Sequence, residues 1–415
     1  MKKYGISVDI GTTNITLHLT DLVTGALLKE VNFQNPQREY GEEIISRIDF
    51  ARSPENAEIL TRIIRRAISE GLSSLFIDSM CHQDDVDSVI VVGNTVMHYL
   101  FFGLSTESLL KPPYKAEYKE SILIPATDVD LDLRAEAICY SPPLIESFIG
   151  ADAVAMMLAS GFSKTTSGLV AIDVGTNTEI AAMNGGEIWI ASAASGPAFE
   201  GMSIVCGTPG VDGAISDVQI DPSDLRPHYH TIGNSKPTGI CGTGVISAIA
   251  SMLNTGVLLT RGSFDRGKVT PWLVTDETIA YFVLVPAPET ALHSRIILTQ
   301  PDIRMLQQSK ASIRAALGQV LKNAQLQPSD VTELYLTGIF GSGLKIEDAV
   351  RIGLFPEMVN AKVKQVQGGA SLGADLLHRQ EFRKFAEQIS AKANYIELTD
   401  NPEFKKGFTE NLPFP

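Results

Sequence analysis

The chain has 415 residues, which at roughly 150 residues per domain predicts two or three domains and a large core. Aspartate and glutamate total 48 against 34 lysines and arginines, and the formal net charge is −14. This balance argues against a nucleic-acid binder, which presents a basic face to phosphates. A local anion pocket stays compatible with it, because backbone N–H groups can hold a phosphate.

The four cysteines lie far apart and form no CxxC pair, so local spacing predicts no iron–sulfur site. Few, scattered cysteines fit a reducing cytosol. The amino terminus enters an alternating apolar strand directly after its lysines, so we expect no signal peptide. Since no segment reaches the ~20 apolar residues of a membrane span, we expect a soluble, cytoplasmic protein with no membrane partner.

One pattern occurs twice along the chain. Residues 4–22 read YGISVDIGTTNITLHLTDL, and residues 169–184 read LVAIDVGTNTEIAAMN. In both, an apolar strand ends near an aspartate. A glycine and a threonine come next, and a second alternating strand begins after them. A third strand follows each pair, the second time after the hairpin signal at residues 184–186, Asn-Gly-Gly. Each half is therefore predicted to open with a three-stranded meander.

The periodicity changes after each meander. Residues 41–71 have helical spacing and precede a short apolar strand at 88–92, and the second half repeats this order with a helix at about 302–325 and a strand at 333–337. Three antiparallel strands followed by alternating helix and strand, in two copies, predict an α/β protein. Its two ribonuclease-H-like halves would face each other across a nucleotide cleft.

We assign residues 1–162 to the first half and residues 168–415 to the second, with an insertion over about 199–298. A last strand near 361–366 leads to a helix over 368–380 that begins on small residues. The expected architecture is thus a repeat of one fold with one added region.

Each strand–turn has the chemistry of a phosphate site. A glycine after a strand lets the backbone approach an anion, and the hydroxyl and N–H groups that follow can donate to phosphate oxygens. An aspartate at the strand end can hold Mg²⁺ through water, because Mg²⁺ gives up its hydration reluctantly. One such turn is a weak signal, but two between alternating strands are a much stronger one. The candidate metal-binding and catalytic carboxylates are Asp9 and Asp173, and the candidate phosphate-binding residues are Gly11, Thr12, Thr13, Gly175, Thr176 and Asn177.

The ordered motifs resemble those of the sugar-kinase, Hsp70 and actin superfamily of ATP-binding proteins. They are VDIGTT, VVGNT, IDVGTNTE, TGIFGSG and GGASLGA, at Val8–Thr13, Val91–Thr95, Ile172–Glu179, Thr337–Gly343 and Gly368–Ala374. In that superfamily the first and third correspond to the phosphate motifs, the fourth to the adenosine motif, and the second and fifth to a pair of hinge helices. The resemblance implies an ATPase that uses Mg²⁺, with Gly338, Gly341 and Ser342 at the adenosine; a tight strand–helix junction explains the same glycines.

Longer segments are similar to the reductive activators of corrinoid proteins. They are NPQREYGEEIISRI at 35–48, GNTVMHYLFFG at 93–103, IGADAVAMMLASG at 149–161, ASGPAFEG at 194–201 and GICGTGVISAIASML at 239–253. Those enzymes use ATP to drive reduction of an inactive Co(II) corrinoid to Co(I) on a partner protein of a methyltransferase system. The resemblance therefore implies ATP hydrolysis in methyl-transfer metabolism and a corrinoid-protein partner.

Members of that family usually carry an iron–sulfur domain beside the ATPase portion. This sequence begins at the first ATPase strand and has no clustered cysteines. We therefore expect no iron–sulfur cluster within the chain. The electron would come from a separate, low-potential, ferredoxin-like protein, or from a domain of a longer protein of which this chain is a portion.

Three further features are candidates for a functional role. Residues Gly242, Thr243 and Gly244 open a helix whose free N–H groups are candidate nucleotide contacts. Glu200 is a candidate for orienting the attacking water, against an exposed glutamate in a structural loop. Cys241 resembles the cysteine that helps to hold a cluster between the subunits of 2-hydroxyacyl-CoA dehydratase activators, although a buried structural cysteine is the favoured interpretation.

Other functions are open on the same fold. A small-molecule kinase would need a catalytic aspartate placed for a substrate hydroxyl, and the sequence has no recognisable motif for one. A nucleotide-binding scaffold of the actin type would polymerise or carry a membrane-tail helix. A dimeric iron–sulfur activator of a dehydratase is the remaining alternative, and it leaves a homodimer open. The first hypothesis is the ATP-hydrolysing corrinoid activator.

Overall fold

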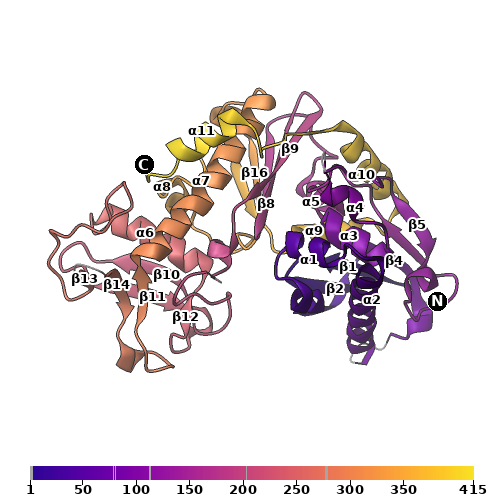
Figure 1. Cartoon of the computed structure of the whole chain (residues 1–415), viewed down its shortest axis with the longest axis horizontal. Coiled ribbons are helices and arrows are strands. Elements are labelled where there is room, and N and C mark those ends of the chain that lie inside the picture. Colours follow the sequence, from indigo (N-terminus) through magenta and orange to yellow (C-terminus); the bar gives the residue numbers. More distant parts are fainter. Residues whose placement is uncertain (1–2, 78, 80, 112–113, 202, 276–278) are drawn as a thin grey trace. The chain divides into compact units, whose positions relative to one another are not determined.

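The computed structural model describes residues 3–77, 79, 81–111, 114–201, 203–275 and 279–415. These residues form two compact units, each with its own internal contacts. Unit 1 holds the residues up to Ser167 together with Gly185–Ile188 and Gly368–Tyr395, and unit 2 holds Gly168–Asn184, Trp189–Gln367 and Ile396–Pro415. Figure 1 shows the elements of both units along the chain.

The sheet of unit 1 has the strand order β3-β2-β1-β4-β6-β5. Its strands are β1 (Tyr4–Ile10), β2 (Asn14–Asp21), β3 (Leu27–Gln34), β4 (Val86–Gly93), β5 (Ile122–Pro125) and β6 (Ile138–Ser141). Strands β1, β2 and β3 pair antiparallel, whereas β4 pairs parallel with both β1 and β6. The meander followed by a parallel strand is the arrangement that the sequence predicts.

Unit 1 also contains helices, several of which pack against this sheet. They are α1 (Ile44–Phe50), α2 (Pro54–Ile77), α3 (Thr95–Phe102), α4 (Glu107–Leu110), α5 (Ala151–Ser160), α9 (Gly369–Leu376) and α10 (Gln380–Lys392). Helix α2 is amphipathic, and its buried residues Leu60, Ile64, Ile68, Leu72 and Leu75 recur every three or four positions. Helices α9 and α10 come from the far end of the sequence, and their yellow ribbons lie among the purple elements of unit 1 in Figure 1.

Helix α9 packs against α5 and β1, whereas α3 packs against α2 and β4. The sequence motifs had paired α9 with α3, and that pairing is wrong. The physical reason is the small residues of α5 and α9, which allow their backbones to approach closely. A Cβ on Gly373 of α9 would lie 1.9 Å from the carbonyl oxygen of Ala155 on α5.

A second six-stranded sheet has the order β17-β16-β7-β8-β9-β18. Its strands are β7 (Leu169–Val174), β8 (Asn177–Asn184), β9 (Glu187–Ala194), β16 (Glu333–Gly338), β17 (Lys362–Gln365) and β18 (Ala393–Tyr395). Strand β7 pairs antiparallel with β8 and parallel with β16, as β1 does with β2 and β4. Gly185 and Gly186 have φ values of +59° and +83°, so the predicted Asn-Gly-Gly turn forms between β8 and β9. Two ribonuclease-H-like sheets are therefore confirmed.

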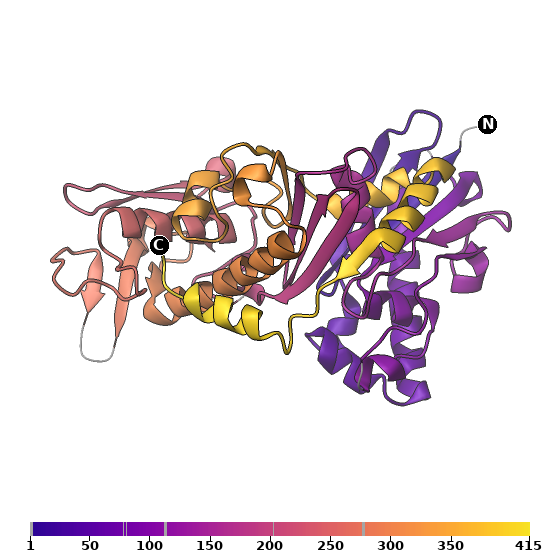
Figure 2. The same ribbon diagram turned by 90° about the horizontal axis from the view of Figure 1, so that it is seen from above.

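The region between β9 and the long helix α7 (Gln300–Asn323) holds two smaller sheets of unit 2, of order β11-β10-β12 and β13-β14-β15. Their strands are β10 (Ala214–Ile220), β11 (Pro227–Thr231), β12 (Gly239–Ile240), β13 (Leu273–Thr275), β14 (Ala280–Val285) and β15 (Ile296–Thr299). Helix α6 (Gly242–Asn254) packs against β10 and near α8 (Ile346–Arg351), and α11 (Pro402–Glu410) lies along α7, as Figure 2 shows.

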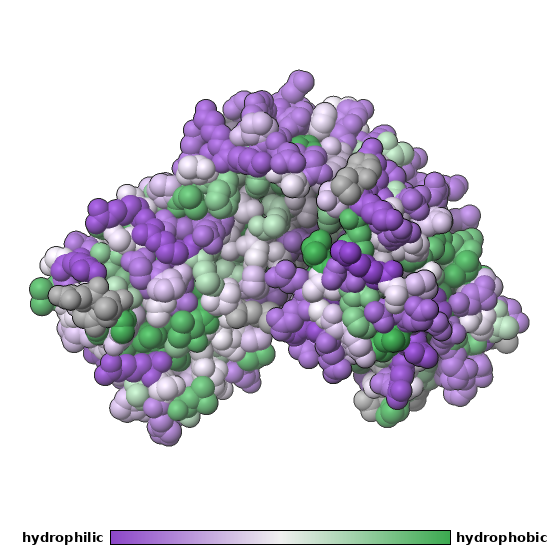
Figure 3. All heavy atoms as spheres, viewed as in Figure 1, coloured by the Kyte–Doolittle hydropathy of each residue, from purple (hydrophilic) through white to green (hydrophobic). Residues whose placement is uncertain are grey.

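Within the residues that the structure describes, no helix has both the length and the apolar character needed to cross a membrane. On the face shown in Figure 3, hydrophilic side chains dominate, and apolar ones occur in separate groups. This surface agrees with a chain in which charged residues make up 20%.

Candidate functional site

The first candidate phosphate turn, residues 11–13, joins β1 to β2 in unit 1. Asp9 is the penultimate residue of β1, and its Oδ2 accepts a 2.7 Å hydrogen bond from Oγ of Ser371. Ser371 is a buried residue of α9. Burial raises the pKa of Asp9 above its usual value, although the hydrogen bond from Ser371 opposes that shift.

Two asparagines hold this turn in place. The side chain of Asn35 donates to the carbonyl oxygen of Gly11 at 2.9 Å, and its backbone N–H donates to the carbonyl oxygen of Thr13 at 2.8 Å. Asn94 donates to Oγ1 of Thr12 at 3.1 Å while its Oδ1 caps the first N–H groups of α3. These hydrogen bonds hold the turn against the segments that carry Asn35 and Asn94.

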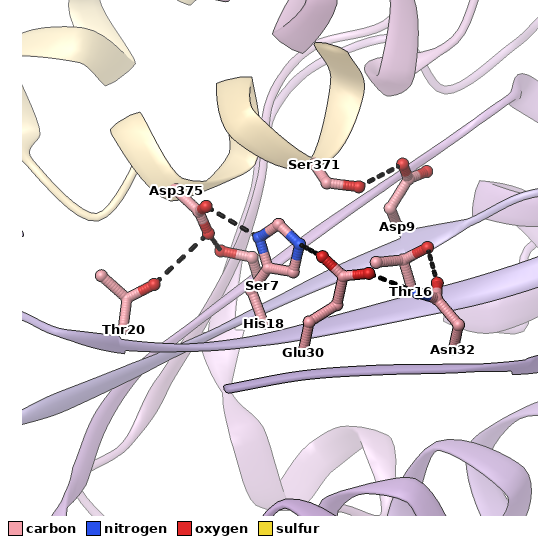
Figure 4. A network of polar contacts seen from close by, with 9 residues as sticks. All are labelled: Ser7, Asp9, Thr16, His18, Thr20, Glu30, Asn32, Ser371 and Asp375. Atoms are coloured by element: carbon pink, nitrogen blue, oxygen red, sulfur yellow. Dashed lines mark hydrogen bonds and ion pairs between the residues drawn. The ribbon is translucent and has the colours of Figure 1, made fainter. Parts of the chain in front are cut away.

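Helix α9 contacts the β1–β2 hairpin a second time through Asp375, which lies one helical turn after Ser371. Oδ1 of Asp375 accepts hydrogen bonds from Ser7 at 2.6 Å and from Thr20 at 3.4 Å, and Oδ2 lies 2.8 Å from Nδ1 of His18. Figure 4 shows these side chains pointing toward Asp375 from the neighbouring strands, with Ser371 directed at Asp9. Buried polar contacts thus fasten α9 to the strands that carry the turn.

The imidazole of His18 lies between two carboxylates. Its Nε2 is 3.3 Å from Oε2 of Glu30, and its other nitrogen faces Asp375. Burial alone would lower the pKa of His18, but the hydrogen bonds and charges of Asp375 and Glu30 outweigh burial and raise it. His18 is therefore stabilised in its charged form as an ion-paired anchor for α9.

The second candidate turn, residues 175–177, joins β7 to β8 in unit 2. Asp173 stands opposite Glu179 across the β7–β8 ladder and opposite Thr337 across the ladder to β16. Gly338, which ends β16, has φ +67°, and a Cβ there would lie 2.5 Å from Oδ1 of Asp173. Any residue larger than glycine at position 338 would therefore displace the carboxylate of Asp173.

The SGPAFEG segment, residues 195–201, meets this second turn. Oγ1 of Thr176 donates a 2.7 Å hydrogen bond to Oε1 of Glu200, and the N–H of Gly196 donates to the carbonyl oxygen of Thr176 at 2.9 Å. The hydroxyl of Ser195 lies 3.2 Å from the carbonyl oxygen of Gly175. The structure thus brings Glu200 to the candidate phosphate turn, which composition alone could not predict.

The candidate adenosine segment connects β16 to α8. Gly341 packs tightly, since a Cβ there would lie 2.4 Å from the carbonyl oxygen of Val366. Oγ of Ser342 accepts a 2.8 Å hydrogen bond from Gln367. Phe340 is buried and meets Phe199 edge-on, with ring centroids 5.3 Å apart. The candidate adenosine segment and the SGPAFEG segment therefore pack against each other through these two phenylalanine rings, beside the second turn.

The small residues at the start of α6 allow close packing against neighbouring backbone. A Cβ on Gly242 would lie 1.8 Å from the carbonyl oxygen of Phe199, and one on Gly244 would lie 2.2 Å from that of Ile215. Cys241 is 6% exposed and its Sγ lies 3.3 Å from the carbonyl oxygen of Ile215 and from Oγ1 of Thr243. These contacts agree with a buried structural cysteine, and the nucleotide contacts expected at residues 242–244 stay a prediction.

Oxygen donors at the two turns suit a hydrated Mg²⁺. Mg²⁺ keeps several waters and needs only one or two protein carboxylates, and each turn has one nearby, Asp9 in unit 1 and Asp173 in unit 2. Among the described residues, no group of three or more His, Cys, Asp or Glu side chains is placed to enclose a metal ion. Among the described residues, none of the four cysteines forms a disulfide: Cys81, Cys139, Cys206 and Cys241.

Sequence reasoning did not single out several residues around the first turn: His18, Asn94, Arg47, Ser371 and Asp375. One signal was available, because Ser371 and Asp375 are four residues apart in the GGASLGA helix and so share one helical face. Polar side chains on the packed face of a helix indicate specific partners, but the identity of those partners needs the structure.

Two ribonuclease-H-like sheets, each with an Asp-x-Gly-Thr turn after its first strand, define an actin-like protein of the ASKHA class. A family model for the RACo middle region matches residues 4–165, and one described as the C-terminal domain of RACo, the ASKHA domain, matches residues 168–415. The chain belongs to the RACo family.

Two curated relatives align with 99% of this chain. The corrinoid activation enzyme RamQ of Eubacterium limosum is 31% identical and is covered over 70% of its length. A [Co(II) methylated amine-specific corrinoid protein] reductase of Methanosarcina barkeri is 28% identical and is covered over 77% of its length. A solved reductive activator for a corrinoid, iron–sulfur protein superposes with a TM-score of 0.89 at 29% identity, over all of this chain and 66% of that one. The chain therefore spans about two thirds to three quarters of these proteins.

Proposed function

We propose that this chain is the ATPase portion of a reductive activator, which drives reduction of a Co(II) corrinoid on a partner protein of a methyltransferase system to Co(I). The carrying observation is membership of the RACo family along both parts of the chain. The printed activities of the two curated relatives, corrinoid activation and Co(II) corrinoid protein reduction, support the same reaction.

The overall change is a one-electron reduction coupled to hydrolysis. One electron from a low-potential, ferredoxin-like iron–sulfur donor converts Co(II) to Co(I), while ATP and water give ADP and inorganic phosphate. The donor is a separate protein or a further domain of a longer chain. Coupling to ATP is needed because the donor cannot reduce a stabilised Co(II) centre unaided. The reduction becomes favourable only if a protein state binds the Co(I) form more tightly than the Co(II) form.

The residues at the two turns divide the chemistry of hydrolysis. Asp9 and Asp173 would hold hydrated Mg²⁺, which when bound neutralises charge on phosphate oxygens. The hydroxyl and N–H groups of Thr12, Thr13, Thr176 and Asn177 would donate to the phosphates. Glu200 would accept a proton from the attacking water, and its contact with Thr176 supports this assignment because it places the carboxylate at the phosphate turn.

The adenosine would lie against Gly338, Gly341 and Ser342. Support comes from the resemblance of this segment to the adenosine motif and from its place beside Asp173, since a Cβ on Gly338 would lie 2.5 Å from Oδ1 of Asp173. A contribution from residues 242–244 rests on the N–H groups at the start of α6, which has its first turn beside the backbone of Phe199.

The decisive experiment measures ATP hydrolysis and cobalt state together. The chain is mixed with a corrinoid protein in its Co(II) form and titanium(III) citrate as the low-potential reductant, and Co(I) absorbance is followed with and without ATP. We expect ATP-dependent formation of Co(I) and faster hydrolysis when the corrinoid protein is present. The Asp173→Asn variant serves as the control that lacks hydrolysis.

Other outcomes would point elsewhere. Phosphate transfer to a metabolite would indicate a small-molecule kinase, and filament formation without hydrolysis would indicate a scaffold. Cell fractionation tests the expected cytoplasmic location, and mass measurement in solution tests whether the chain forms the homodimer that the sequence leaves open. None of the observations above favours a role with nucleic acid.

A further inference from the structure

Arg47, on α1 of unit 1, is a fully buried arginine behind the first phosphate turn. Its side chain is among the largest with no exposed surface. The guanidinium donates through Nη2 to the carbonyl oxygen of Thr12 and through Nε to that of Gly41 at 2.7 Å. Weaker contacts reach the carbonyl oxygen of Glu42 at 3.4 Å and Sδ of Met97 at 3.5 Å. Backbone carbonyls and a thioether are thus its partners.

The charge of a second arginine, Arg38, acts on Arg47. Burial and the neighbouring charge of Arg38 lower the pKa of Arg47 to about 10, so it is still protonated at neutral pH. Arg38 forms a long ion pair, with 3.9 Å between its Nη2 and Oε1 of the exposed Glu42. Within the described part of the chain, Arg47 makes no ion pair with a carboxylate at 4.0 Å or less. Among the described residues, Arg47 thus brings a charge without a paired carboxylate to the first turn of a chain whose net charge is −14.

A buried charge without an opposite charge is unfavourable, so proteins retain one where it meets a counter-ion. The turn that Arg47 contacts is the one whose glycine and threonines have the chemistry of a phosphate site. A bound polyphosphate at residues 11–13 would supply the missing negative charge, and the low dielectric of the interior would strengthen the attraction.

We propose that Arg47, assisted by Arg38, is the counter-charge for the polyphosphate at the first turn. It is a positioning residue: it acts through the backbone of Thr12 and sets the preference for nucleotides with more phosphates. This inference rests on the proposed nucleotide site and deepens it. The competing explanation is that Arg47 only ties α1 to the turn.

The two explanations differ in how binding depends on ligand charge. A purely structural tie would weaken ATP, ADP and AMP by the same factor when it is lost. A counter-charge would weaken ATP most and AMP least, because Coulombic attraction grows with the charge of the ligand. The ratio of ATP to AMP affinity is therefore the informative quantity, and it does not depend on hydrolysis.

The test is calorimetric titration of the full chain with ATP, ADP and AMP in buffer containing Mg²⁺. We expect Arg47→Gln to lower the ATP-to-AMP affinity ratio by on the order of tenfold, as expected for one charge in a partly buried site. Arg47→Lys keeps the charge and should keep the ratio, even if all three affinities fall together. Arg52→Gln removes an exposed arginine of the same unit and should leave the ratio unchanged.

Equal weakening of all three nucleotides in Arg47→Gln would overturn the proposal. If that variant does not fold, Arg38→Gln decides, because its side chain is not enclosed; we expect the ratio to fall about threefold, and an unchanged ratio would overturn the proposal. Failure of the wild-type chain to bind any nucleotide would instead contradict the proposed ATPase itself.

Discussion

The hydroxyl of Ser371 donates a 2.7 Å hydrogen bond to Oδ2 of Asp9, although 362 positions separate them in sequence. Both residues lie in unit 1, where α9 packs against β1. The bond places a side chain from near the end of the chain on the carboxylate that we assign to Mg²⁺. Any change in the position of α9 would therefore be felt directly at Asp9.

Replacing Ser371 by alanine should impair Mg²⁺-dependent hydrolysis. The buried carboxylate of Asp9 would lose a donor, and a hydrogen bond to a charged group contributes about 1.5–3 kcal/mol. We expect kcat to fall about tenfold and the Mg²⁺ concentration for half activation to change, both measured by phosphate release across a Mg²⁺ series. Ser371→Thr keeps a hydroxyl and should restore most of the activity, whereas Ser73→Ala on the exposed face of α2 should have no effect. Equal activity in Ser371→Ala and the wild type would exclude a positioning role.

The repeated meanders could be predicted from the sequence, because alternation and turn residues are local signals. Strands β1, β2, β7 and β8 follow from them, and so do both Asp-x-Gly-Thr turns. The contacts around Asp9 could not be predicted, since Ser371 reaches it only after α9 packs against β1. The partner of α9 was mistaken for the same reason: close packing between glycine and alanine faces decides it, and motif order does not.

The role of Glu200 could not be predicted from the sequence for a different reason. Composition could not separate a catalytic glutamate from an exposed one in a structural loop, because both have the same local sequence. The hydrogen bond from Thr176 and the contact between Phe199 and Phe340 depend on tertiary packing. The residue types of the second turn could thus be predicted, but not the group that completes it.

Replacing Glu200 by glutamine should slow hydrolysis while preserving nucleotide binding. Glutamine keeps an acceptor for Oγ1 of Thr176 but cannot take a proton from water, and loss of a general base lowers rates about 10²–10⁴-fold. Single-turnover hydrolysis measures the chemical step, and calorimetry measures nucleotide affinity. Glu357→Gln, an exposed glutamate in the same unit, is the matched control. Wild-type single-turnover rates in Glu200→Gln would assign the glutamate a structural role only.

Replacing Gly338 by alanine should damage both stability and activity. The new Cβ would lie 2.2 Å from the carbonyl oxygen of Val174 and 2.5 Å from Oδ1 of Asp173, in addition to the strain of φ +67°. Gly343 separates the two effects, because it has φ +75° with nothing within 4 Å of a Cβ. We expect Gly343→Ala to lower the free energy of unfolding by about 1 kcal/mol, and Gly338→Ala by about 3 kcal/mol or more with loss of hydrolysis. Denaturant titration and phosphate release check both; similar effects of the two variants would show that contact with Asp173 is unimportant.

The buried imidazole of His98 should make the protein less stable in acid. His98 lies on α3 with 2% exposure, and its Nδ1 is 3.1 Å from Oγ of Ser141. Burial lowers its pKa to about 3 from the usual 6.5. The unfolded chain therefore takes up a proton below pH 6.5 while the folded chain stays neutral, so stability is lost as the pH falls from 6.5 toward 3. At pH 5 this linkage removes about 2 kcal/mol relative to pH 7. Denaturant titrations measure the free energy of unfolding at pH 7 and at pH 5. The difference between the two values should be smaller by about 2 kcal/mol in His98→Asn than in the wild type. It should be unchanged in His293→Asn, which replaces an exposed histidine. An equal pH dependence in wild type and His98→Asn would mean that the buried ring is already protonated in the folded state.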